Sequence, residues 1–196
     1  DHIIYCSELL TQKTNEKYDS FIECVSKGIV KVSQNNTLKN NVPVGILNKN
    51  NTFRTYYEHP FKHKTIKTYR NFLGISGLSK EKNIIKDEIF YSSYNTLYPF
   101  LILLINQHPA ITESWLLNWK LYDNKNNIGL FKIGESWYSK SFKKRRGVNY
   151  AEQLVKLNPQ SVKIIKDIIK ITSIARNYLK SENNQDYEYM LLASRT

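Results

Sequence analysis

Hydrophobic residues recur at helical spacing along the first part of the chain. The spacing predicts helix over residues 1 to about 32, with Gly28 near its end and a short strand over residues 29–32. Asparagine is abundant between residues 33 and 51, where turns are expected around a short strand or extended segment at residues 42–47. This asparagine-rich stretch is the candidate linker.

A more regular pattern begins near residue 82. An apolar run predicts a helix of about ten residues over 97–106, and a break at residues 108–109 separates it from a second helix over 112–119. The second helix is expected to bury three apolar residues: Trp115, Leu116 and Trp119.

Segments with strand character follow in the second half of the chain. Residues 128–139 predict a β-hairpin with its turn near Gly134. Residues 153–157 predict a further strand, and residues 187–192 an edge strand. The expected fold class is therefore α+β and mainly helical, with a small antiparallel β-sheet near residues 128–157.

One long helix is expected between the last two strands. Asn158 provides an N-cap, and Pro159 occupies the first helical position. Apolar residues recur from Val162 to Leu179, and the lysines of this segment fall largely off that face. The pattern indicates an amphipathic helix with one buried side.

Charge narrows the class of partner. The 196 residues contain 29 Lys and Arg against 17 Asp and Glu, so the formal net charge is +12. Such an excess favours nucleic acid, and then an anionic membrane surface, over a general bias toward lysine and asparagine. With 41% apolar residues the chain can bury a core, which excludes a wholly disordered protein. The longest apolar run, residues 100–105, is too short to span a bilayer.

Cysteine and histidine offer little metal or disulfide chemistry. Cys6 and Cys24 stand apart without a CxxC pattern, which indicates two thiols in a reducing, cytoplasmic compartment. His59 and His63 are spaced i, i+4, but Pro60 lies between them and no third ligand has a suitable spacing. We expect no metal site and no cofactor.

The densest charge lies in residues 140–146, where five of seven residues are basic. At the tip of a hairpin these side chains would contact phosphates, and binding would depend steeply on salt. The alternative is a solvated loop or a basic run of the nuclear-localisation type. Residues 52–80 also interleave aromatic and basic side chains, which suits a nucleic-acid surface or a half-buried amphipathic segment. The predicted DNA-binding residues are Lys143, Lys144, Arg145 and Arg146.

Several residues stand in a recognisable order around the second helix and the hairpin. They are Glu113, Leu117, Trp119 and Asp123, then Val155, Lys156 and Leu157 before the long helix, and the run Arg145, Arg146 and Gly147 in the basic segment. This order resembles the tyrosine recombinases of the phage-integrase superfamily, and the run of two arginines and a glycine resembles a divergent integrase branch. The resemblance covers about residues 90–196, roughly half of the chain.

The resemblance implies a domain that breaks and rejoins DNA through a 3′-phosphotyrosyl link, without metal or cofactor. Lys140 maps to the family's hairpin lysine, which protonates the leaving 5′ oxygen, and Lys143 is the next candidate. Ala110 stands where the family's first catalytic arginine would be. No histidine is followed by arginine three residues later, and no tyrosine has the context of the nucleophile. This chain alone is therefore expected to be inactive, as a fragment whose nucleophile lies elsewhere.

Two domains and two alternative functions are expected. Residues 1–80 form an N-terminal segment of unassigned type that could bind DNA, and residues 81–196 form a partial recombinase-like catalytic domain. The first function is that of a DNA-binding fragment of a site-specific recombinase that holds double-stranded DNA as a homo-oligomer, without membrane contact. The alternative is a non-catalytic DNA-binding protein on a similar scaffold.

Overall fold

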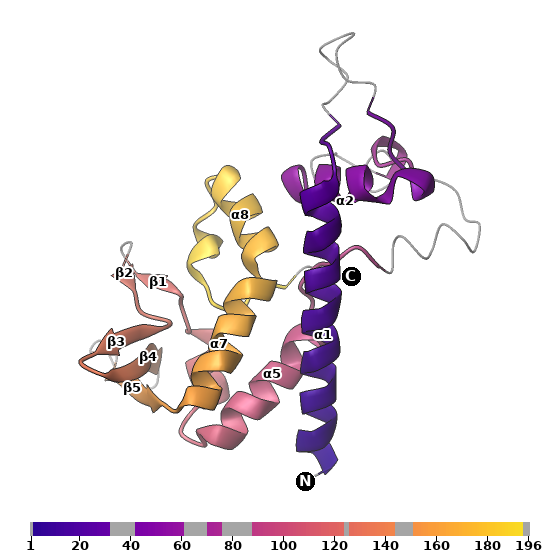
Figure 1. Cartoon of the computed structure of the whole chain (residues 1–196). Coiled ribbons are helices and arrows are strands. Elements are labelled where there is room, and N and C mark those ends of the chain that lie inside the picture. Colours follow the sequence, from indigo (N-terminus) through magenta and orange to yellow (C-terminus); the bar gives the residue numbers. More distant parts are fainter. Residues whose placement is uncertain are drawn as a thin grey trace. The chain divides into compact units, whose positions relative to one another are not determined.

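The computed structural model describes residues 2–31, 42–60, 70–75, 88–123, 126–143 and 151–193 (Figure 1). The helical elements are α1 (His2–Lys27), η1 (Ile46–Asn48), α2 (Lys49–Glu58), α5 (Tyr94–Gln107), α6 (Glu113–Leu117), α7 (Pro159–Ile171), α8 (Ser173–Ser181) and η3 (Gln185–Glu188). The strands are β1 (Tyr122–Asp123), β2 (Asn126–Asn127), β3 (Phe131–Ile133), β4 (Ser136–Lys143) and β5 (Ala151–Leu157). They form an antiparallel pair, β1–β2, and an antiparallel sheet in the order β3–β4–β5. The mainly helical α+β class and the small sheet within residues 128–157 are confirmed.

Contacts divide the chain into two compact units. One unit comprises Asp1–Asn15 and Tyr91–Thr196, and the other comprises Glu16–Phe90. Helix α1 contributes its first part to one unit and its second part to the other. The expected segments 1–80 and 81–196 differ from this division, because the first turns of α1 group with the C-terminal part of the chain.

Aromatic side chains fill the core of the Glu16–Phe90 unit. The ring of Phe21 in α1 lies 5.2 Å from that of Phe53 and 6.0 Å from that of Tyr56, both in α2, measured between centroids. All three residues are buried. This aromatic cluster packs the second part of α1 against α2.

The short strand expected at residues 29–32 is wrong for its described part, residues 29–31. The backbone N–H of Ile29 donates to Asn51 Oδ1 at 2.9 Å, and that of Lys31 donates to Thr55 Oγ1 at 2.9 Å. Side chains of α2 therefore accept the hydrogen bonds that a partner strand would otherwise accept.

The extended segment expected at residues 42–47 ends in the turn η1. Gly45 has a φ of 114°, a backbone conformation that favours glycine. Its N–H donates to Thr52 Oγ1 at 2.6 Å, so a buried threonine of α2 fixes the start of the turn.

Helix α5 confirms the helix expected over residues 97–106 and begins three residues earlier, at Tyr94. Ser93 accepts a hydrogen bond from the backbone of Thr96, and Thr96 accepts one from the backbone of Ser93. This reciprocal capping box satisfies two donors that the helix start would otherwise leave unpaired.

Helix α6 is shorter than the helix expected over residues 112–119. Trp115 and Trp119 are fully buried as expected, and their rings lie 4.9 Å apart. Leu116 is only half-buried, so the prediction that it lies in the core is wrong.

The long helix expected after Asn158 is two helices. Asn158 caps α7 with Pro159 in the first turn, as expected. The helix then breaks at Thr172, whose hydroxyl donates to the Ile168 carbonyl at 2.7 Å and accepts from buried Arg176 at 3.1 Å. The single helix is wrong because Thr172, which was expected on the apolar face, hydrogen-bonds to the Ile168 carbonyl and to buried Arg176 at the point where the helix breaks. Helix α7 packs against α5 and β5 (Figure 1).

The edge strand expected at residues 187–192 is also wrong. This stretch contains the end of η3 and then a single β-bridge between Lys120 and Tyr189. Arg176 donates to the carbonyl oxygens of Tyr187 and Tyr189. A guanidinium group thus occupies acceptors that a strand would offer to a neighbouring strand.

Candidate nucleic-acid interface

The three-stranded sheet has one face that packs against a helix. Ser139 and Ser141 of β4 are fully buried there. The indole Nε1 of Trp119 donates to Ser139 Oγ at 2.8 Å, and Ser141 Oγ donates to the carbonyl of Trp115 at 2.6 Å. Because side chains alternate along a strand, Lys140 lies on the opposite face from these serines.

Lys140 lies in the middle of the other face of the sheet. Pairing places it opposite Leu154 of β5 and places Tyr138 opposite Lys156. Leu154 and Lys156 are exposed, and the ring of Tyr138 lies 6.3 Å from that of Phe131 in β3. Basic and aromatic side chains therefore share one surface. We call it the open face: Phe131, Tyr138, Lys140, Phe142, Glu152, Leu154 and Lys156.

The ammonium group of Lys140 is held on the open face by two contacts. Its Nζ lies 2.8 Å from Glu152 Oε1 and 5.5 Å from the ring centroid of Phe142. The side chain of Glu152 is 58% exposed, so solvent screens the ion pair. Such a pair contributes about 0–1 kcal/mol. Another anion can therefore replace the carboxylate at small cost.

The expected position of the basic run at a hairpin tip is wrong for its first residues. Residues 140–143 belong to β4, and Lys143 pairs with Ala151 of β5. The segment whose composition suggested a loop is therefore paired as a strand, and the hydrogen bond from buried Ser141 to the α6 backbone holds it there. Three predicted DNA-binding residues lie outside the described residues: Lys144, Arg145 and Arg146.

Ala110 lies beside the same pair of strands. Its carbonyl accepts a hydrogen bond from Gln153 Nε2 at 3.1 Å. Gln153 pairs with Ser141, the neighbour of Lys140 along β4. The residue at the family's arginine position is thus exposed next to the lysine strand, with a methyl group in place of a guanidinium.

Lys156 is an open-face cation that is not among the predicted DNA-binding residues. It is exposed, and it forms no ion pair within the described part of the chain. The alternation of side chains along β5 indicates its position: Val155 and Leu157 on either side of it are buried, so Lys156 faces the other way. The register with β4 is still needed to place Lys156 opposite Tyr138.

His108 makes a contact that no local sequence pattern marks. Its Nε2 lies 2.7 Å from Ser161 Oγ in the first turn of α7. Burial lowers the pKa of His108, so the imidazole is neutral near pH 7. Ser161 has no exposed surface, and the pair therefore joins the end of α5 to the start of α7 and offers no nucleophile to a substrate.

A shallow pocket near the end of α8 holds the protein's own cation. Its lining residues are Tyr122, Lys180, Asn183 and Tyr187. The Nζ of Lys180 lies 5.3 Å from the ring centroid of Tyr122 and 5.2 Å from that of Tyr187. The lysine occupies the position that a ligand cation would take between the two rings.

Metal-ligating residues do not gather in the described ranges. No group of three or more His, Cys, Asp or Glu residues there could hold a metal ion. His59 follows α2 as its C-cap, and His63 lies outside the described residues. Cys6 and Cys24 are free thiols. Within the same ranges, no helix has the length and apolar character needed to cross a membrane.

Comparisons of the chain with protein-family models, with curated proteins and with solved structures find no match. The relationship to tyrosine recombinases stays a prediction that rests on the residues of this chain.

Proposed function

We propose that this chain is the DNA-binding part of a site-specific tyrosine recombinase. It would hold double-stranded DNA against the open face and the basic run 140–146, as a homo-oligomer in the cytoplasm. The phosphotyrosyl link would be made by a nucleophile outside these residues, so this chain alone would not cleave DNA. The observation that carries the proposal is the position of Lys140, a cation in the middle of an open strand face with exposed Lys156 nearby.

Lys140 has the surroundings that a lysine near a scissile phosphate needs. Its partner Glu152 presents a carboxylate oxygen at 2.8 Å, which is the distance at which a phosphate oxygen would also accept from an ammonium group. Glu152 is more than half exposed and can turn into solvent when DNA arrives. The carboxylate would then orient the lysine before binding and leave it to the phosphate afterwards.

A non-catalytic DNA-binding protein on the same scaffold is the second candidate, and Ala110 favours it. A methyl group cannot bind a phosphate through two hydrogen bonds as a guanidinium does. Under this alternative, Lys140 and Lys156 supply only electrostatic attraction to the DNA backbone.

Duplex affinity at several salt concentrations tests DNA binding. We expect tight binding at low salt, and replacement of all four predicted residues by glutamine should lower the slope of log K against log[salt] by up to about 0.9 per lost phosphate contact. Lys13→Gln is the matched control, since Lys13 is an exposed lysine of α1. Absence of duplex binding by the unchanged chain at low salt would overturn the proposal. Equal slopes for the fourfold variant and the control would remove the basic run from it.

A separate experiment distinguishes the recombinase from the alternative. The recombinase requires a His-x-x-Arg motif and a nucleophilic tyrosine, which the encoding reading frame beyond Thr196 should supply. In that longer protein, Lys140→Gln should slow DNA cleavage, and a substrate with a 5′-bridging sulfur should restore the rate, because a thiolate leaves without a proton donor. A reading frame without both motifs would leave the non-catalytic alternative.

A further inference from the structure

A second group of lysines lies on the side of the sheet away from Lys140. Lys132 of β3 is the register partner of Trp137 in β4, so both side chains lie on the same face. Trp137 is three residues from Lys140, which places it on the opposite face. The sheet therefore carries cations on both faces.

The ammonium groups of two lysines lie close to the ring of Trp137. The Nζ of Lys132 lies 5.1 Å from the ring centroid, and the Nζ of Lys166 in α7 lies 5.3 Å from it. One lysine comes from the sheet and the other from a helix, so the tryptophan joins two elements of the fold through its contacts with cations. Trp137 itself is half-buried.

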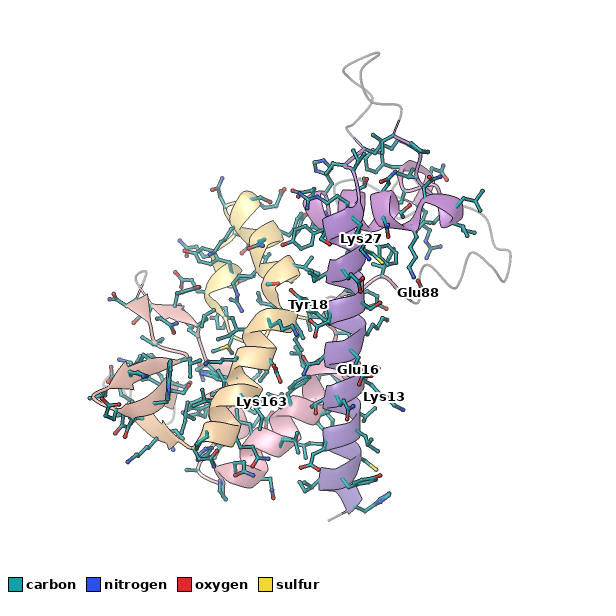
Figure 2. The ribbon with its side chains drawn as sticks, in the orientation of Figure 1. Lys13, Glu16, Tyr18, Lys27, Glu88 and Lys163 are labelled. Atoms are coloured by element: carbon teal, nitrogen blue, oxygen red, sulfur yellow. The ribbon has the colours of Figure 1, made fainter. Side chains whose placement is uncertain are left out.

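These lysines lack acidic partners. Lys132 and Lys166 are exposed, and neither forms an ion pair with the described acidic residues. Lys163, one turn earlier on α7, is also exposed, and it too forms no ion pair with a described acidic residue (Figure 2). Two ammonium groups beside one ring repel each other, and an anion bound between them relieves that repulsion.

We infer that Lys132 and Lys166 beside Trp137, together with Lys163 one turn earlier on α7, form a second contact site for the phosphate backbone of duplex DNA. We call it the Trp137 site. The inference goes beyond the proposed function, which needs only the open face and the basic run. The Trp137 site would bind backbone phosphates without reading sequence, because its cations are flexible lysines.

The chemistry of the Trp137 site favours a polyanion over a lipid surface. A tryptophan that anchors a protein in a membrane presents its ring to the lipid interface. Here both ammonium groups lie near the ring, both lysines are exposed, and the tryptophan is half-buried. Charged groups therefore meet the partner together with the indole, as expected for binding to a chain of phosphates.

The test compares two double variants of the whole chain. Lys132→Gln/Lys166→Gln removes the two lysines at Trp137. The matched control, Lys13→Gln/Lys180→Gln, removes two exposed lysines of α1 and α8, and Lys180 also lies over aromatic rings (Figure 2 shows Lys13). We expect the first variant to bind a labelled duplex about tenfold more weakly and with a salt slope lower by about 0.9 per lost contact. The control should bind within about twofold of the unchanged chain.

Conservative replacement separates charge from packing. Lys132→Arg/Lys166→Arg keeps both cations and should bind the duplex as the unchanged chain does. Weak binding by both the glutamine and the arginine variants would mean that the lysine stems support the fold, and it would overturn the inference. A loss no larger than that of the control would overturn it as well.

Fluorescence of Trp137 gives an independent measurement. Trp115 and Trp119 have no exposed surface, so a dissolved quencher reaches Trp137 first. Iodide, an anion that the lysines attract, should quench the emission, and saturating duplex should protect it. Unchanged iodide quenching in the presence of bound duplex would show that DNA does not reach the Trp137 site.

The outcomes for the two faces of the sheet are distinguishable. The variant Lys140→Gln/Lys156→Gln alters the open face alone. If duplex binding falls in this variant and not in Lys132→Gln/Lys166→Gln, the Trp137 site is refuted and the open face stands. If binding falls only in Lys132→Gln/Lys166→Gln, the open face is refuted and the Trp137 site stands.

Discussion

Arg176 should contribute more to stability than any exposed lysine, although it has no carboxylate partner in the described structure. The residue is 4% exposed and lies on α8. Its guanidinium donates to the carbonyls of Tyr187, Tyr189 and Met190 and to the hydroxyl of Thr172. The segment held in this way also pairs with the chain before β1, where the N–H of Met190 donates to the Trp119 carbonyl at 3.0 Å.

The expected effect of Arg176→Met is the difference between two opposing terms. Burial lowers the pKa of Arg176 to about 10, and this shift corresponds to a cost of about 3 kcal/mol for keeping the charged form in the fold. The four hydrogen bonds from a charged donor contribute about 1.5 kcal/mol each. Replacing the arginine removes both terms, so the variant should be less stable by about 3 kcal/mol.

Urea unfolding measures this difference. Lys163→Met is the control, because it removes an exposed cation from the neighbouring helix and should change stability by less than about 0.5 kcal/mol. Hydrogen exchange should also become faster at the amide of Met190 in Arg176→Met. A variant as stable as the unchanged chain, or more stable, would refute the prediction. The cost of burying the charged guanidinium would then equal or exceed the free energy gained from its hydrogen bonds.

Two further predictions concern buried polar contacts. Burial lowers the folded-state pKa of His108 below 6.5, so the stability contributed by the neutral imidazole is complete above that pH and is lost as the pH falls below it. Between about pH 8 and pH 5, the melting temperature should therefore fall more for the unchanged chain than for His108→Gln. Equal falls in the two proteins would contradict this prediction. Trp119→Phe removes the donor to buried Ser139 and should cost about 2–3 kcal/mol in urea unfolding. Trp137→Phe, at a half-buried ring, is its control, and equal losses in the two variants would contradict the prediction.

Local signals predicted much of the C-terminal part of the fold. The hairpin over residues 128–139 was visible from alternation and from Gly134, which has a φ of 57° in the turn. The cap at Asn158 was visible because an asparagine before a proline provides the acceptor and the backbone angle that a helix start needs. Such features depend on a few neighbouring residues, so the sequence alone is sufficient for them.

Features that depend on distant residues were not predictable in this way. The break at Thr172 involves Arg176, whose backbone acceptors lie 11 to 14 residues later, between Tyr187 and Met190. The open face depends on the register of β4 and β5, which sets Lys140 opposite Leu154. Composition located the charge in residues 140–146, but the buried contacts of Ser139 and Ser141 decide that its first residues are strand.

The continuity of α1 has a consequence for how the protein can be divided. The helix runs unbroken from His2 to Lys27, while the boundary between the two compact units falls after Asn15. The side chain of Asn15 donates to Asp167 of α7 at 3.0 Å, and Phe21, six residues later, packs on α2. A cut at that boundary would open several backbone hydrogen bonds of the helix and create two frayed ends. Producing either unit as a separate protein would therefore require a new helix cap, because the border between the units lies within a helix and not in a loop.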